Sequence, residues 1–222
     1  MIFSTFSKRF LAINLFFVLG SFTSYSWGGA YDDFIYAVKF NDEKRVAQLL
    51  QRGIDPNSTE VERGETALMI ALRENSMRVF NTLLHHPEIK LEAGAANGDT
   101  ALMLASYLAN FDAVKNLISA GAKVNRSGWT ALHYAAAAGQ PEIIAYLLDH
   151  EAQIDAISPN RTTPLMMAVS SGRNKAVSVL IERGANLEAR NDAGMTAYDF
   201  AMHYEQKSIA QDLAKRLALS KP

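Results

Sequence analysis

A six-residue block recurs along this 222-residue chain at intervals of 34, 30, 33 and 33 residues. Each block begins with threonine and ends with alanine, and an apolar pair such as Leu83-Leu84 or Leu147-Leu148 follows twelve residues after that alanine. An earlier unit lacks the threonine but keeps the spacing, with Ala37 ahead of Leu49-Leu50. Self-similarity at a fixed period of roughly 20–50 residues indicates a stack of repeats. The blocks are Thr66–Ala71, Thr100–Ala105, Thr130–Ala135, Thr163–Ala168 and Thr196–Ala201.

The residue types within one unit predict a short helix, a turn and a second helix. The threonine hydroxyl suits the N-cap of the first helix, and Pro164 is tolerated in a first helical turn. Gly139 marks a turn, after which Ile143, Ile144 and Leu147 follow helical spacing. Polar segments rich in Asn, Asp and Gly separate the units and are expected to form projecting turns or hairpins. Glycine suits a helix stop; the expected stops are Gly53, Gly121 and Gly184.

These units resemble ankyrin repeats. The six-residue block is similar to the T-P-L-H-x-A signature of that family, and a G-A-x-x-N pattern such as Gly121–Asn125 lies near the close of a unit. The resemblance covers about residues 31 to 217. It implies an all-α ankyrin-repeat solenoid of about six helix-turn-helix units, connected by short β-hairpins or turns. The repeat domain is placed at residues 27–222, with units at approximately 31–64, 65–98, 99–128, 129–161, 162–194 and 195–220.

The sequence departs from the family's pattern in three ways. Methionine replaces the signature histidine in several units, other residues stand where glycine is usual, and the connection before Trp129 is three residues short. These departures affect the expected shapes of single loops and leave the expected fold unchanged. The replaced histidine positions are Met69, Met103 and Met166, and the replaced glycine positions are Pro87, Glu151 and Arg161.

The N-terminus has the pattern of a secretory signal peptide at residues 1–26. Lys8 and Arg9 precede an apolar run, Phe10 to Leu19, and small and polar residues follow. The run is shorter than the roughly 20 residues that a membrane anchor needs, so cleavage is favoured and no anchor is expected afterwards. We prefer cleavage after Ser26, with Ala30 as a second option. The alternative is a buried N-terminal helix that caps the fold. Export predicts a periplasmic protein of bacterial type.

Composition excludes several classes of function. Lys and Arg total 22 against 23 for Asp and Glu, so the chain lacks the positive charge that binding to nucleic acid requires. No cysteine is present, which removes disulfides, thiolate zinc sites and cysteine nucleophiles.

No residue pattern points to catalysis, to a metal or to another cofactor. No G-x-S-x-G, G-x-x-x-x-G-K-[ST] or G-x-G-x-x-G motif is present, and no histidine pair has the spacing of H-E-x-x-H. The adjacent His85 and His86 are expected at a solvated helix end. The methionines that recur at one repeat position could suggest a soft metal such as copper(I), but they fit gap filling in the core better. For His133, the resemblance implies a structural side chain that hydrogen-bonds the backbone between repeats.

The resemblance also implies where a partner binds. In ankyrin repeat proteins, partners usually lie against the concave face, which consists of the connection tips and the exposed side of each first helix. Aromatic residues and arginine dominate interface energetics, so we single out Trp129, Tyr107 and Arg73. Trp129 has an alternative role, packing on the shortened connection. The full set of expected contact residues is Glu65, Asp99 and Trp129 on the tips, and Arg73, Tyr107, Leu108, His203 and Tyr204 on the helices.

We therefore expect a monomeric, periplasmic, non-catalytic module that binds a protein partner. A second hypothesis is an inhibitor or an accessory, protective factor of an exported enzyme. A third, that the chain is itself an enzyme, has no residue to support it. The sequence does not identify the partner.

Overall fold

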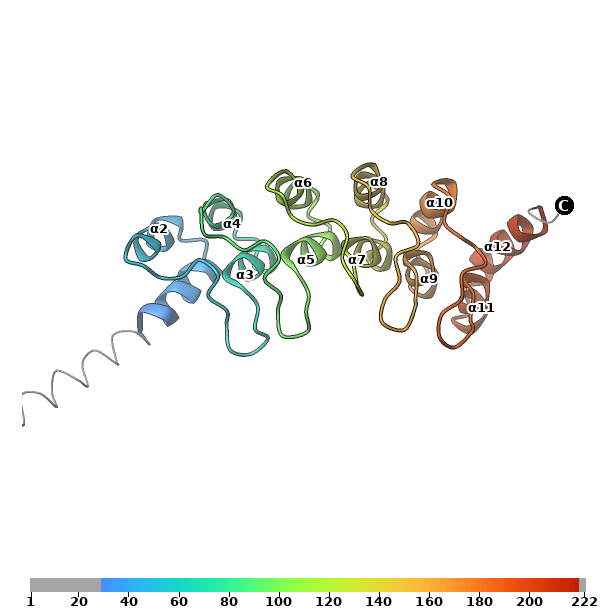
Figure 1. Ribbon diagram of the computed structural model, residues 1–222, viewed down its shortest axis with the longest axis horizontal. Coiled ribbons are helices and arrows are strands. Elements are labelled where there is room, and N and C mark those ends of the chain that lie inside the picture. Colours follow the sequence, from blue (N-terminus) through green and yellow to red (C-terminus); the bar gives the residue numbers. More distant parts are fainter. Residues whose placement is uncertain (1–28, 220–222) are drawn as a thin grey trace, which may run out of the picture.

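The computed structural model describes residues 29–219 as an elongated stack of helix pairs (Figure 1). The predicted signal peptide lies outside the described residues. Residues 29–39 form a helix at the start of the stack. The helices lie in two rows, and the loops before the first-row helices project to one side. The first row continues with α3 (Ala67–Arg73), α5 (Ala101–Tyr107), α7 (Ala131–Ala138), α9 (Pro164–Ser170) and α11 (Ala197–His203). The second row contains α2 (Glu43–Gln51), α4 (Met77–Leu84), α6 (Phe111–Ser119), α8 (Pro141–Asp149), α10 (Asn174–Glu182) and α12 (Lys207–Leu219).

The repeated threonine begins each first-row helix from α3 to α11, as predicted. In four of these helices its side chain accepts a hydrogen bond from the backbone N–H three residues later. The side chain at that third position often bonds back to the threonine N–H. Asp199 does so with its carboxylate at 2.8 Å, His133 with Nδ1 at 3.3 Å, and Met103 with its sulfur at 3.4 Å. Methionine therefore keeps part of the capping role of the signature histidine, through a weaker acceptor.

The core lies between the two rows and runs the length of the stack. Leu83, Leu117, Leu147, Leu180 and Leu213, which are the first members of the apolar pairs, are all 0% exposed. Each first-row helix from α3 to α9 packs on its second-row partner and on the first-row helix of the next unit, as α7 does on α8 and α9. Neighbouring repeats therefore cover one another, which is how a solenoid is stabilised. The three methionines of the repeated position are at most 2% exposed, so their place in the core is confirmed: Met69, Met103 and Met166.

Two of the three residues that replace the expected glycines, Glu151 and Arg161, keep the left-handed backbone of the repeat, whereas Pro87 does not. Glu151 has a φ of 64° and Arg161 a φ of 58°, next to 96° for the stop glycine Gly121. A non-glycine residue in this region costs about 1 kcal/mol or more. The loop shapes therefore follow the repeat, not the local residue preference.

The loops before α3, α5, α7, α9 and α11, which we call the tip loops, contain little β-structure. Within residues 29–219 the one β-pairing is a bridge between Thr59 and Thr66, so the expected connections are mostly turns. A main-chain hydrogen bond closes four of the five loops; in the loop before α5 it joins Ala95 N–H to Asp99 C=O at 2.9 Å. The tip loop before α7 projects less far than its neighbours (Figure 1). The tip loops are residues 58–65, 95–99, 125–129, 158–162 and 191–195.

Candidate functional site

The eight predicted contact residues lie in three tip loops and at the C-terminal ends of three first-row helices. We keep the term concave face for the tip loops and the exposed side of the first-row helices. Glu65, Asp99 and Trp129 each end a tip loop, immediately before the capping threonine. The other five lie at the C-terminal ends of helices. Arg73 is the last residue of α3. Tyr107 ends α5 with Leu108 as its C-cap, and His203 ends α11 with Tyr204 as its C-cap.

Glu65 is not the exposed tip residue that the sequence suggested. Its side chain is buried, with a residue exposure of 5%. Both of its carboxylate oxygens accept hydrogen bonds from Arg73 Nε, at 3.1 and 3.0 Å. This hydrogen bonding by Glu65 is the main reason why the pKa of Arg73 is raised. Glu65 therefore holds the Arg73 guanidinium in place.

Asp99 is likewise engaged within the fold. The hydroxyl of Tyr134 on α7 donates a hydrogen bond to Asp99 Oδ1, and the amide of Asn97 donates to Oδ2 at 2.7 Å. Burial raises the pKa of the Tyr134 hydroxyl, and the hydrogen bond to Asp99 raises it further. The phenol therefore stays protonated and keeps donating. Asp99 fixes the position of the Tyr134 ring.

Four large side chains surround an apolar pocket of about 220 Å³ on the concave face, which we call the aromatic pocket. The ring of Tyr107 meets that of Tyr134 edge to face, with centroids 6.2 Å apart. Trp129 meets His133 in the same way at 5.3 Å. Tyr107 is 54% exposed, whereas Trp129 is half-buried and packs against the core. The lining residues are Tyr107, Trp129, His133, Tyr134, Ala137 and Met167.

A more polar pocket of about 310 Å³ lies beside it, between α3 and α5. The ion pair of Glu65 and Arg73 forms part of its lining, together with Arg63 and Asp99. Since Asp99 bonds to Tyr134 of the aromatic pocket, the two pockets meet at this hydrogen bond. The concave face over α3, α5 and α7 therefore offers a charged section next to an aromatic one.

The structure separates His203 and Tyr204 from these pockets. Their rings meet edge to face, with centroids 4.8 Å apart, and Tyr204 is 48% exposed. They belong to α11, two first-row helices beyond α7. They form an exposed aromatic end of the concave face and contribute nothing to the aromatic pocket.

Sequence reasoning missed Tyr134 and Met167, which line the aromatic pocket. Both stand four residues after a capping threonine, at the repeat position where Ile70 and Leu104 are buried. The sequence did offer one signal: Tyr134 stands where the two preceding repeats have an aliphatic residue. A partly buried phenol needs a polar partner, which indicates a contact beyond the core.

Within the described part of the chain, no three His, Cys, Asp or Glu side chains gather as a metal site. None of the helices in residues 29–219 is both long and apolar enough to cross a bilayer. His133, at the signature position, is fully buried; burial lowers its pKa, and hydrogen bonds occupy both ring nitrogens.

Comparison with known proteins identifies the family. The family model described as ankyrin repeats (3 copies) matches residues 34–127, 68–158, 122–191 and 154–219. The human SH3 and multiple ankyrin repeat domains protein 2 is 31% identical over 178 residues, which are 78% of this chain and 10% of that protein.

Two further relatives are similar over shorter stretches. The glycerophosphocholine phosphodiesterase gde1 of Schizosaccharomyces pombe is 30% identical over 70% of this chain and 14% of its own length. The Neurogenic locus notch homolog protein 1 of Xenopus tropicalis is 33% identical over 60% of this chain and 5% of its own length. This chain thus spans only 5% to 14% of these three relatives. The matches along residues 34–219 show that the chain belongs to the ankyrin repeat family, whose repeats are protein–protein interaction modules.

Proposed function

We propose that this chain is a monomeric, non-catalytic binding module of the bacterial periplasm, which holds a protein partner against its concave face. The aromatic pocket is the proposed anchor site. The charged section over α3 and the exposed aromatic end at α11 are the proposed flanking contacts.

The observation that carries this proposal is the exposure of Tyr107 beside the aromatic pocket. A ring that is 54% exposed contributes little to the stability of the stack. Aromatic side chains next to a pocket are the groups that most often dominate a protein interface. Leu108, 36% exposed, extends the apolar surface beside Tyr107. Asp99 already fixes the orientation of the Tyr134 ring, so this side chain loses less conformational entropy when a partner binds.

The experiment is affinity capture from a periplasmic extract of the native host, with the purified chain as bait and mass spectrometry as the readout. The wild-type chain is compared with Tyr107→Ala and with Lys175→Ala, an exposed residue of α10 in the second row. A protein that Tyr107→Ala loses and Lys175→Ala retains supports the proposal. Equal capture by all three baits rejects Tyr107 and the aromatic pocket as the anchor site.

The periplasmic location rests on the signal-peptide pattern of residues 1–26. The identity of the captured protein distinguishes two forms of the proposal. A hydrolase recovered in a stoichiometric complex, with altered activity, would make the chain an inhibitor or protective factor.

A further inference from the structure

The tip loop before α7 leaves its main chain unpaired. The other four tip loops each carry a closing main-chain hydrogen bond, for example from Ser158 N–H to Thr162 C=O at 3.1 Å. In contrast, no main-chain group of Arg126, Ser127 or Gly128 forms a hydrogen bond with another residue of the described range 29–219. This repeat is three residues shorter than the two that follow it, and its tip loop has no closing main-chain hydrogen bond. Such groups must find partners outside the loop.

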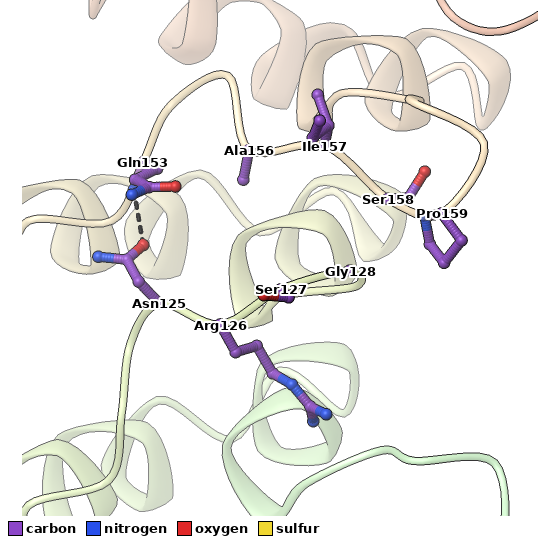
Figure 2. Close-up of a pocket in the computed structure, with 9 residues that line it drawn as sticks. All are labelled: Asn125, Arg126, Ser127, Gly128, Gln153, Ala156, Ile157, Ser158 and Pro159. Carbon is purple, nitrogen blue, oxygen red and sulfur yellow. Dashed lines mark hydrogen bonds between the residues drawn. The ribbon is translucent and has the colours of Figure 1, made fainter.

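An open recess of about 800 Å³ adjoins this unpaired main chain (Figure 2). Residues 125–128 form one wall, and the loop of residues 153–159 forms the other. The side chain of Asn125 fixes the two walls at one end: its Oδ1 accepts from Gln153 N–H at 2.8 Å, and its Nδ2 donates to Glu151 C=O at 2.7 Å. The recess is therefore a built feature of the stack, with a volume in the range of about 300–1,000 Å³ that is common for ligand sites.

The second wall also offers unpaired groups. The main-chain N–H and C=O of Ile157 form no hydrogen bond with any residue of the described part, and its side chain is 49% exposed. Gly128 lacks a side chain opposite the ring of Pro159, so its backbone is open to close approach. Figure 2 shows the Arg126 side chain directed away from this wall, and its Nη1 donates to Gly98 C=O at 2.8 Å. The recess thus presents main chain and the apolar side chains of Ile157 and Pro159, and Arg126 is the one charged residue in its lining.

We propose that this recess binds an extended segment of the partner polypeptide through main-chain hydrogen bonds. The proposal rests on the proposed function and adds to it a second contact and the form of the partner. Water satisfies the unpaired groups in the free protein, and an extended peptide replaces it with alternating N–H and C=O groups. One apolar side chain of that segment packs on Ile157 and Pro159. The longer neighbouring tip loops favour a single protruding segment over a flat protein surface.

The test uses twelve-residue random peptides displayed on phage, selected on the full chain and then synthesised. Each selected peptide is also made with alternate amides N-methylated, which removes main-chain donors and keeps every side chain. Affinities are measured for the wild type and for a chain whose residues 126–128 are replaced by the sequence of residues 156–161. This replacement restores the three missing residues, keeps Asn125 and Trp129, and is designed to occupy the recess. The matched control inserts Gly-Gly-Ser after Asp192 in the last tip loop, and circular dichroism confirms that both chains fold.

We expect peptides whose affinity falls about tenfold on N-methylation, as the loss of one or two main-chain hydrogen bonds predicts. The same peptides should lose binding to the lengthened loop and bind normally to the control insertion and to Tyr107→Ala. If no selected peptide shows this pattern, the recess is not a peptide site. Peptides that depend on Tyr107 alone would overturn this inference and leave the concave-face proposal standing. Natural partner capture that neither the lengthened loop nor Tyr107→Ala weakens would reject both.

Discussion

Nε2 of His133 lies 2.9 Å from the carbonyl oxygen of Thr162, and this hydrogen bond joins α7 to the tip loop before α9. The same ring accepts the N–H of Thr130 at Nδ1. The two contacts require the neutral tautomer with its proton on Nε2. The structural role that the family resemblance implied for His133 is confirmed: its ring ties two repeats together.

The burial of His133 predicts a dependence of stability on pH. Burial lowers its pKa below the usual value of about 6.5, so below that pH the unfolded chain binds a proton that the folded chain does not. The contribution of His133 is therefore fully present above about pH 6.5 and is lost as the pH falls towards its folded pKa.

The measurement is urea unfolding at pH 7.5 and pH 5.5 for the wild type and His133→Met. Methionine is the matched control because Met103 and Met166 occupy the same repeat position and do not titrate. The wild type should lose more unfolding free energy than the variant over this interval. Equal losses would show that His133 does not cause the pH dependence.

The ion pair of Glu65 and Arg73 predicts a strong coupling in a double-mutant cycle. Arg73→Met leaves a carboxylate buried with no cation beside it, so it should destabilise the fold by about 1–3 kcal/mol. Glu65→Gln removes the buried charge and should restore part of that loss in the Arg73→Met background. Chemical denaturation of the four chains gives the coupling free energy. Additive effects would place Glu65 at the surface, as the sequence alone suggested.

The stacking of repeats predicts that a cavity in the middle of the row is costly. Leu147 of α8 is 0% exposed, so Leu147→Ala should lower the unfolding free energy by about 2–5 kcal/mol. Lys175→Ala, on the exposed side of α10, should change it by less than about 0.5 kcal/mol. Thermal unfolding followed by circular dichroism measures both, and similar midpoints for the two variants would contradict this packing.

The fold was predictable because its signals repeat. The threonine caps, the apolar pairs and the stop glycines recur at the same positions of successive repeats. A repeat with an unusual residue can therefore still be assigned from its neighbours. Glu151 and Arg161 adopt the left-handed backbone of the repeat although their residue types disfavour it. The packing of neighbouring repeats determines the backbone conformation of these two loops. The residue types of Glu151 and Arg161 alone do not predict it.

The site was less predictable, because it depends on contacts between repeats. Tyr134 of α7 bonds to Asp99 in the tip loop before α5, and even within one repeat Glu65 pairs with Arg73 eight residues later. The alternative left open for Trp129 is resolved in part, since its ring both packs on His133 and lines the aromatic pocket. The three-residue shortening was visible in the sequence, but the unpaired main chain beside it was not.

The proposed export predicts a shortened chain in the native host. If Lys8, Arg9 and the apolar run after them act as a signal peptide, a signal peptidase cleaves near Ser26 or Ala30. Mass spectrometry of the purified native protein should find Trp27 or Tyr31 at the N-terminus. A cytoplasmic protein that retains Met1 would overturn the periplasmic assignment.

Tyr107 and Trp129 differ in exposure, and this difference predicts different effects for Tyr107→Ala and Trp129→Ala. Tyr107 is more than half exposed, so its removal should change the unfolding free energy by less than about 0.5 kcal/mol. Trp129 is half-buried and packs edge-on against His133, so its removal should cost about 1 kcal/mol or more. If the pocket is the anchor site, both variants weaken partner binding by about 2 kcal/mol or more.

Tyr107→Ala is therefore the decisive variant, because its loss of binding cannot follow from loss of stability. Isothermal calorimetry with the captured partner gives the binding free energies, and thermal unfolding gives the stabilities. A partner that binds Tyr107→Ala at full affinity but Trp129→Ala weakly would show that Trp129 acts through the fold, and that the anchor lies elsewhere on the concave face.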